Sequence, residues 1–171
     1  AQALDFIAQL KKTPIVVNDA RGFFTSRFIG AFVDDAIGMV AEGVNPALID
    51  NCARQAGMPV GPLAITDELS IELSVHAGEA QKKEFPDVYK EGRSVPVLKK
   101  LYDLGRLGKK VGKGFYDHDE SGKRLWPGLA GLYPPKAEQP NPHDLKQRIL
   151  YVQALEAARA MEEGVLPSPA D

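Results

Sequence analysis

Apolar residues recur at intervals of three or four positions in several parts of the chain, and this spacing predicts amphipathic helices. In the longest such segment, at 23–42, apolar residues follow one another every four positions: Phe24, Phe28, Phe32, Ala36 and Val40. A stripe of this kind marks the face of a helix that packs against a core. Further helices are predicted at 3–11, 45–56, 97–104 and 144–163 and around 63–83.

Residues typical of helix ends stand between the first two of the longer segments. Gly43 follows the longest apolar stripe and is a natural C-terminal cap, because glycine adopts the left-handed conformation found there. Asn45 and Pro46 form a start signal, with Asn45 as N-cap and Pro46 at the first helical position. Gly57 ends the second helix. We therefore expect two helices joined by a short turn.

Little β-structure is predicted. Residues 14–17 indicate a brief strand, which is expected to join a sheet outside the chain, because one strand alone cannot satisfy its backbone hydrogen bonds. Residues 115–126 predict a small hairpin around a polar turn. Residues 127–142 contain five prolines and indicate an irregular crossing segment. The expected fold class is mainly α, with a short N-terminal strand and a small hairpin.

An internal repeat relates two parts of the chain. Residues 27–50 align without a gap to residues 148–171, at an offset of 121, and seven of the 24 aligned positions are identical. Composition alone would give roughly one or two identities. Both copies contain Glu-Gly-Val-x-Pro, which is a helix end followed by a helix start. Two amphipathic helices with glycine caps also resemble each other somewhat, and this alternative stays open.

If the repeat is genuine, the last helix belongs to its second copy. That copy ends at Asp171, so the chain is expected to stop inside a second domain and to be a piece of something longer. A repeat unit needs partner helices to cover its apolar stripe. The stripe formed by Leu145, Ile149, Ala157 and Met161 is therefore expected to pack back on the first copy.

Composition narrows the class of protein. Of the 171 residues, 44% are hydrophobic and 26% charged, with a formal net charge of -2, which gives no support for binding nucleic acid or an anionic membrane through bulk charge. No apolar run approaches the roughly 20 residues of a membrane span. Cys52 is the only cysteine, which excludes an internal disulfide and favours a reducing, cytoplasmic compartment.

A series of motifs in a set order resembles the C-terminal part of the 3-hydroxyacyl-CoA dehydrogenases. The series comprises KTPIVV (12–17), GFFTSR (22–27), EGV (42–44), Asp50, MPVGPL (58–63), Asp67 and GRLGKKVGKGFYD (105–117). It covers the first repeat nearly throughout, from about 18 to 118. The resemblance implies a helical domain of the 6-phosphogluconate-dehydrogenase-like kind. Two successive copies are typical of multifunctional fatty-acid oxidation proteins, whereas single-copy relatives pair as dimers.

The resemblance also implies a chemistry, the NAD-dependent oxidation of a 3-hydroxyacyl-CoA in fatty-acid β-oxidation. A histidine oriented by a glutamate takes the hydroxyl proton, and a Gly-x-Gly-x-x-Gly turn holds the dinucleotide. These residues belong to the NAD-binding domain, and no such turn after a strand occurs in this chain. We therefore expect no catalytic, cofactor-binding or metal-binding residue here, and no activity without that domain. The expected partners are the acyl-CoA substrate, the NAD-binding domain and a possible second copy.

The implied domain boundaries follow the motifs. Residues 1–17 would be the end of the NAD-binding domain, and 18–126 the first helical repeat. Residues 127–143 would be the proline-rich crossing, and 144–171 the start of a truncated second repeat. A rival interpretation is a non-catalytic helical module that uses the same fold for oligomerisation.

Ser26 is the candidate substrate-binding residue. The family usually has asparagine at this position, and that side chain meets the substrate. Serine keeps a donor and an acceptor but is shorter. On the residues alone, a serine near the start of the longest helix is explained by solvation or by a bond to the backbone.

Other polar residues favour structural roles. His118 is predicted to be a surface turn residue, His76 to lie on a helix flank and His143 to lie in the crossing segment. Cys52 falls on an apolar helix face and is predicted to be core. The acidic residues around Asp117 lack the spacing of a calcium loop. A basic cluster either meets the phosphates of CoA or is a solvated loop; it comprises Lys99, Lys100, Arg106, Lys109, Lys110 and Lys113.

Overall fold

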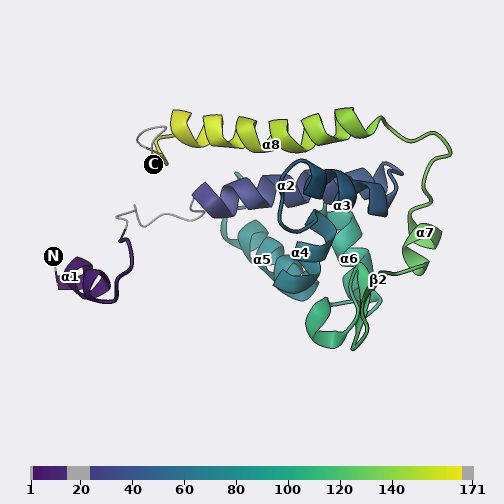
Figure 1. Cartoon of the computed structure of the whole chain (residues 1–171), viewed down its shortest axis with the longest axis horizontal. Coiled ribbons are helices and arrows are strands. Elements are labelled where there is room, and N and C mark those ends of the chain that lie inside the picture. Colours follow the sequence, from purple (N-terminus) through teal and green to yellow (C-terminus); the bar gives the residue numbers. More distant parts are fainter. Residues whose placement is uncertain (1, 15–23, 167–171) are drawn as a thin grey trace.

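The computed structural model describes residues 2–14 and 24–166, and most of them are helical (Figure 1). The helices are α1 (Gln2–Gln9), α2 (Phe24–Ala41), α3 (Pro46–Gln55), α4 (Pro62–Leu69), α5 (Ile71–Glu84), α6 (Val95–Asp103), the 3-10 helix η1 (Lys109–Val111), α7 (Gly128–Leu132) and α8 (Pro142–Glu162). Strands β1 (Tyr116–Asp119) and β2 (Gly122–Leu125) pair antiparallel. The mainly α fold class is confirmed, while three of the four residues of the predicted strand at 14–17 lie outside the described residues.

The central helix is α2, because α3, α4, α6 and α8 all contact it. Its buried residues begin at Phe32 and continue through Ile37 to Val40. Phe24 and Phe28, at the start of the predicted stripe, are only partly buried and contact each other with ring centroids 5.7 Å apart. The core therefore covers the later turns of α2 and leaves its first turns at the edge.

The turn between α2 and α3 has the predicted caps. Gly43 adopts φ +85°, and the Asn45 side chain accepts a hydrogen bond from the amide of Ala47 at 2.9 Å. Pro46 stands in the first turn of α3. Cys52 is 1% exposed, so its assignment to the core is confirmed.

The long helix α8 runs antiparallel to α2 and lies along it and α3 (Figure 1). The prediction that the last helix packs back on the first repeat is confirmed. Leu145 and Ile149 are buried as predicted, but Met161 is 41% exposed. Steps of four residues turn a helix by about 40° more than a full turn, so a stripe of this spacing drifts away from the contact face. Gln153 and Ala160 take the buried positions instead.

The outer face of α8 carries exposed apolar side chains. Leu150, Tyr151 and Leu155 are between 43% and 58% exposed. This face belongs to the same helix whose inner side packs on α2, so α8 is apolar on two sides. Within the described part of the chain, no helix combines the length and apolar composition that crossing a bilayer requires.

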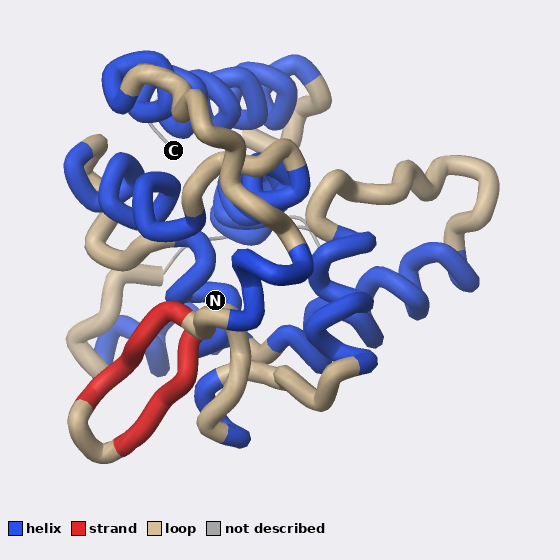
Figure 2. Tube along the Cα trace, turned by 90° about the vertical axis from the view of Figure 1, so that its right-hand side faces the viewer, coloured by secondary structure: helices blue, strands red, loops and turns tan. Residues whose placement is uncertain are grey.

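The hairpin and the crossing segment complete the fold. Figure 2 shows the hairpin projecting from one edge of the helices. The segment 127–142 is less irregular than predicted, because α7 forms within it and buries Leu129. The chain then passes the end of α2, where the amide of Lys136 donates to the carbonyl of Gly43 at 2.9 Å.

Candidate functional site

Two buried carboxylates join the helices to the hairpin, and Asp50 of α3 is the first. Its side chain accepts hydrogen bonds from the amides of Leu63 at 2.9 Å and Ala64 at 3.3 Å, in the first turn of α4. These amides have no partner within their own helix, so a carboxylate satisfies them. The Tyr116 hydroxyl donates to Asp50 at 2.6 Å. A Cβ on Gly61 would lie 2.3 Å from the Asp50 carboxyl carbon, which explains the glycine at this point.

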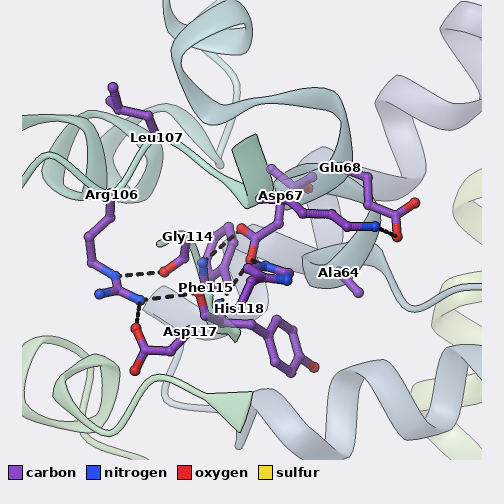
Figure 3. A network of polar contacts seen from close by, with 12 residues as sticks. Ala64, Asp67, Glu68, Arg106, Leu107, Gly114, Phe115, Asp117 and His118 are labelled. Carbon is purple, nitrogen blue, oxygen red and sulfur yellow. Dashed lines mark hydrogen bonds and ion pairs between the residues drawn. The ribbon is translucent and has the colours of Figure 1, made fainter. Parts of the chain in front are cut away.

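Asp67 of α4 is the second carboxylate, and its side chain is fully buried (Figure 3). It accepts hydrogen bonds from the amides of Phe115 at 2.7 Å and Tyr116 at 2.9 Å. The Nε2 atom of His118 lies 2.9 Å from the same carboxylate. A Cβ on Gly114 would come within 2.0 Å of an Asp67 oxygen, so only glycine leaves room for this contact. Asp67 therefore holds the start of the hairpin against α4.

Burial controls the protonation of these groups. Desolvation raises the pKa of both Asp50 and Asp67 above the ordinary value of 3.8, and the hydrogen-bond donors oppose this rise only in part. Burial, together with the nearby Asp50 charge, also raises the pKa of the Tyr116 hydroxyl. The hydroxyl therefore stays protonated and donates to Asp50.

Asp50→Asn is expected to change the pH dependence of stability in one direction. A carboxyl whose pKa rises on folding contributes stability that is complete below its unfolded pKa, near 3.8, and is lost as pH rises through the folded pKa. Asparagine does not titrate there. The free energy of unfolding of wild type minus that of the variant should therefore fall as pH rises from about 4 upward, by at most about 1.4 kcal/mol per pH unit. Urea unfolding across this range measures the difference, and a difference that grows with pH contradicts the assignment.

Arg106 supports the hairpin from the other side (Figure 3). Its guanidinium donates to the carbonyls of Gly114 at 2.7 Å and Tyr116 at 3.2 Å, and to Asp117 at 2.6 Å. It also lies 4.0 Å from the centre of the Trp126 ring. Its side chain is 7% exposed. Both interpretations of the basic cluster, phosphate binding and a solvated loop, are therefore wrong for Arg106, because its charge points into the protein.

The lysines of the basic cluster lie on the surface. Lys109 is 3.5 Å from Glu68, and Lys99 is 4.0 Å from Glu79. These exposed pairs contribute little to stability.

In the glycine-rich loop beside these lysines, the glycine amides donate hydrogen bonds to nearby backbone carbonyls. The amide of Gly108 donates to Lys113, and that of Gly112 to Lys109. The amide of Gly114 donates to Tyr116. A phosphate cradle needs amides that point at the ligand. The amides of these three glycines are therefore already bound within the loop and hairpin.

His118 corrects a prediction made from the sequence. It is not a surface turn residue, because its side chain is 11% exposed and contacts Asp67. The strand period contains the missing signal, since residues two apart point to the same face. His118 therefore shares a face with Tyr116, and their rings lie 6.3 Å apart.

The other two histidines lie on helices. Nε2 of His76 is 3.3 Å from the Tyr102 hydroxyl, at a helix flank as predicted. His143 is in the first turn of α8 and not in the crossing segment, because the helix begins at Pro142. Its ring contacts Gln147 at 3.1 Å.

Ser26 lies in the first turn of α2, and its side chain is exposed. No group within residues 2–14 and 24–166 hydrogen-bonds to its hydroxyl. An exposed hydroxyl of this kind is able to donate to and accept from an external ligand. The geometry therefore separates Ser26 from the buried carboxylates, which bind only groups of the protein itself.

Arg27, the next residue, is bound by Glu156 of α8 and by Glu163, the C-cap residue of that helix. Its guanidinium lies 2.6 Å from Glu156 and 2.5 Å from Glu163. These contacts raise the pKa of Arg27, with the Glu163 hydrogen bond as the largest cause, and the same bond lowers the pKa of Glu163. The first turn of α2 is thereby joined to the last turns of α8.

A second, equivalent set of contacts joins the opposite ends of the two helices. Arg148 of α8 binds Asp35 at 2.7 Å and Glu42 at 2.9 Å. The offset of 121 relates every member of this set to a member of the first: Arg27 to Arg148, Asp35 to Glu156 and Glu42 to Glu163. A reciprocal exchange of partners is the property of a two-fold interface.

The ends of the two helices also correspond. Gly43 and Gly164 have φ +85° and +70°. The next amide in each case, of Val44 or Val165, donates to a carbonyl five residues earlier, at 3.0 Å and 2.8 Å. The sequence repeat is therefore accompanied by matching local geometry and matching contacts.

Comparison with known proteins identifies the family to which the chain belongs. Residues 22–118 match the family described as 3-hydroxyacyl-CoA dehydrogenase, C-terminal domain. The fatty acid oxidation complex subunit alpha of Shewanella loihica is 31% identical over 176 residues, which cover 100% of this chain and 24% of the relative. The protein of the same description from Pseudomonas syringae pv. syringae is 30% identical over 189 residues, covering 100% and 25%. The chain thus spans about a quarter of the length of the curated relatives it matches.

Two solved structures share the fold. The dehydrogenase part of multifunctional enzyme 1 from C. elegans has a TM-score of 0.69 and 25% identity, and the match covers 96% of this chain and 38% of that one. The (S)-3-hydroxybutyryl-CoA dehydrogenase from Ralstonia eutropha has a TM-score of 0.59 and 26% identity, and the match covers 70% of this chain and 42% of that one.

Proposed function

Because this chain belongs to the family of 3-hydroxyacyl-CoA dehydrogenase C-terminal domains, we propose that it forms one wall of the acyl-CoA site in an NAD-dependent dehydrogenase of fatty-acid β-oxidation. The observation that carries the proposal is the match over 22–118, which includes the exposed Ser26 in the first turn of α2. The substrate would be a 3-hydroxyacyl-CoA, and the protein would work in the cytoplasm. A non-catalytic oligomerisation module remains the rival.

The catalytic work is divided between this chain and an NAD-binding domain. That domain would hold NAD, which would supply the hydride acceptor for C3 of the substrate. A histidine–glutamate pair of that domain takes the hydroxyl proton, so no catalytic residue is assigned here. The role of Ser26 is to donate a hydrogen bond to a polar substrate atom or to accept one, and thereby to orient the substrate. The glycine-rich loop supports this division, because its amides are bound within the protein.

The proposed domains follow the sequence boundaries. Residues 1–17 would end the NAD-binding domain, which agrees with the absence of buried residues in α1 among the described residues. Residues 18–126 would form the first repeat, 127–143 the crossing and 144–171 the start of the second. The exchange of contacts between α2 and α8 supports a second copy. In single-copy relatives the same contact would join two subunits, so a homo-oligomer of the whole protein remains part of the proposal.

Ser26→Ala in the intact dehydrogenase should lower kcat/KM for acetoacetyl-CoA with NADH. A neutral hydrogen bond formed with the substrate is worth roughly 0.5–1.5 kcal/mol. Its loss should therefore cost on the order of threefold to tenfold in kcat/KM. The melting temperature should change by only a few degrees or less, because the side chain is exposed and alanine is a good helix former. Steady-state kinetics and thermal melts measure the two effects.

Thr25→Ala is the matched control, since Thr25 is exposed in the same turn. It should leave kcat/KM unchanged. Ser26→Asn, which restores the usual family residue, should keep activity. Equal activity of Ser26→Ala and wild type would remove Ser26 from the site. An intact protein that does not reduce acetoacetyl-CoA at all would favour the oligomerisation module.

A further inference from the structure

We propose that Arg27 is a positioning residue for Ser26, held by Glu156 of α8 and by the C-cap residue Glu163, so that the second helical copy orients the substrate-facing turn of the first. The inference rests on the proposed function, because Ser26 is the substrate contact there. It adds a role for α8, which is far from Ser26 in the sequence.

The first turn of α2 has few other attachments. The buried residues of this helix begin only at Phe32, while Thr25 and Ser26 are exposed. The first amides of a helix also have no acceptor within the helix, so such turns fray. A hydroxyl on a fraying turn cannot hold one orientation. An additional contact in this turn therefore decides how well Ser26 is placed.

Arg27 supplies that contact with a defined geometry. Its Nε and Nη2 atoms lie 2.7 Å and 2.6 Å from one oxygen of Glu156, and Nη1 lies 2.5 Å from Glu163. The side chains of Arg27 and Glu156 are 22% and 12% exposed, so water screens this pair only in part. Glu156 is also 3.6 Å from Arg159. A planar guanidinium held by two carboxylates has little freedom to rotate.

The equivalent contacts at the other end of α2 provide a control within the same protein. Asp35 and Glu42 hold Arg148 in the corresponding way. They lie beside the buried part of α2 and not in its first turn. Removing either set breaks ion pairs between the same two helices, and removing Asp35 and Glu42 also breaks the pairs of both carboxylates with Arg93. The control variant therefore loses at least as many ion pairs as the test variant. Only the set around Arg27 is expected to affect Ser26.

The test compares two double variants of the intact dehydrogenase, Glu156→Gln with Glu163→Gln, and Asp35→Asn with Glu42→Gln. The first should lower kcat/KM for acetoacetyl-CoA by about the same factor as Ser26→Ala, on the order of threefold to tenfold. Adding Ser26→Ala to it should cause no further loss, because both changes remove one interaction. The second should keep kcat/KM within about twofold of wild type and should show an additive loss with Ser26→Ala.

Hydrogen exchange of the amides of residues 28–31, which donate to the carbonyls of the first turn of α2, provides a readout that does not depend on activity. Exchange should become faster in the first double variant and stay unchanged in the second. Additive kinetic losses with Ser26→Ala, or equal losses in both double variants, would overturn the positioning role. If Ser26→Ala itself has no kinetic effect, the substrate contact of the proposed function fails. Unchanged exchange at 28–31 in the first double variant would then show that Arg27 does not hold the turn either.

Discussion

Asp67→Ala is expected to be among the most destabilising single substitutions in this chain, lowering the free energy of unfolding by about 3–5 kcal/mol. The carboxylate is fully buried and accepts from two backbone amides, those of Phe115 and Tyr116, besides contacting His118. Alanine leaves these donors buried without an acceptor, which costs about 1–3 kcal/mol for each unsatisfied group. Urea unfolding, followed by the fluorescence of Trp126, the single tryptophan, measures the loss.

Asp119→Asn is the control for this experiment. Asp119 lies in the same hairpin, but its side chain is 44% exposed and binds exposed partners. The change should cost less than about 0.5 kcal/mol, as is usual for surface substitutions. If Asp67→Ala were as mild as Asp119→Asn, the buried contacts would not hold the hairpin to α4.

Arg106→Lys is expected to be the second large loss, about 2–4 kcal/mol, although the charge is kept. The guanidinium donates to two carbonyls and to Asp117 at the same time and lies 4.0 Å from the centre of the Trp126 ring. A lysine ammonium is a compact charge that cannot reproduce this planar arrangement. The fluorescence of Trp126 should also change, because its cationic neighbour moves away. Thermal and urea unfolding check the size of the effect.

Lys110→Ala provides the comparison, since Lys110 belongs to the same basic segment but is exposed. It should change stability by no more than about 0.5 kcal/mol. Similar effects of both substitutions would mean that Arg106 acts as a solvated charge of the cluster and not as a buried support.

Local patterns were sufficient to predict most helices. The apolar spacing of α2, the glycine after it and the Asn45-Pro46 start signal are properties of neighbouring residues, so they can be recognised without a fold. The sequence predicted less accurately which residues of a helix face the core. Met161 continues the spacing of the stripe but is exposed, because a stripe with steps of four residues has rotated off the contact face by that point, while Ala160 is buried.

In the candidate site, too, some residues could be predicted from the sequence and others could not. Ser26 was found by resemblance, and the structure adds only that it is exposed and in the first turn of α2. His118 and Arg106 were misjudged, because their roles depend on partners that the sequence does not identify. His118 contacts Asp67, 51 residues away, and Arg106 lies over Trp126. Spacing along the chain contains little information about such pairs.

By itself, the sequence determined most of the helices, the caps between α2 and α3, the repeat at an offset of 121 and the family motifs. Only the tertiary structure decided that Asp50 and Asp67 satisfy the amides of α4 and the hairpin, and that Arg27 and Arg148 exchange partners between the two copies. The physical reason is that helix formation depends on residues three or four apart. A buried polar group, in contrast, must find a partner wherever the folded chain brings one, and Arg27 finds Glu156 at a separation of 129 residues.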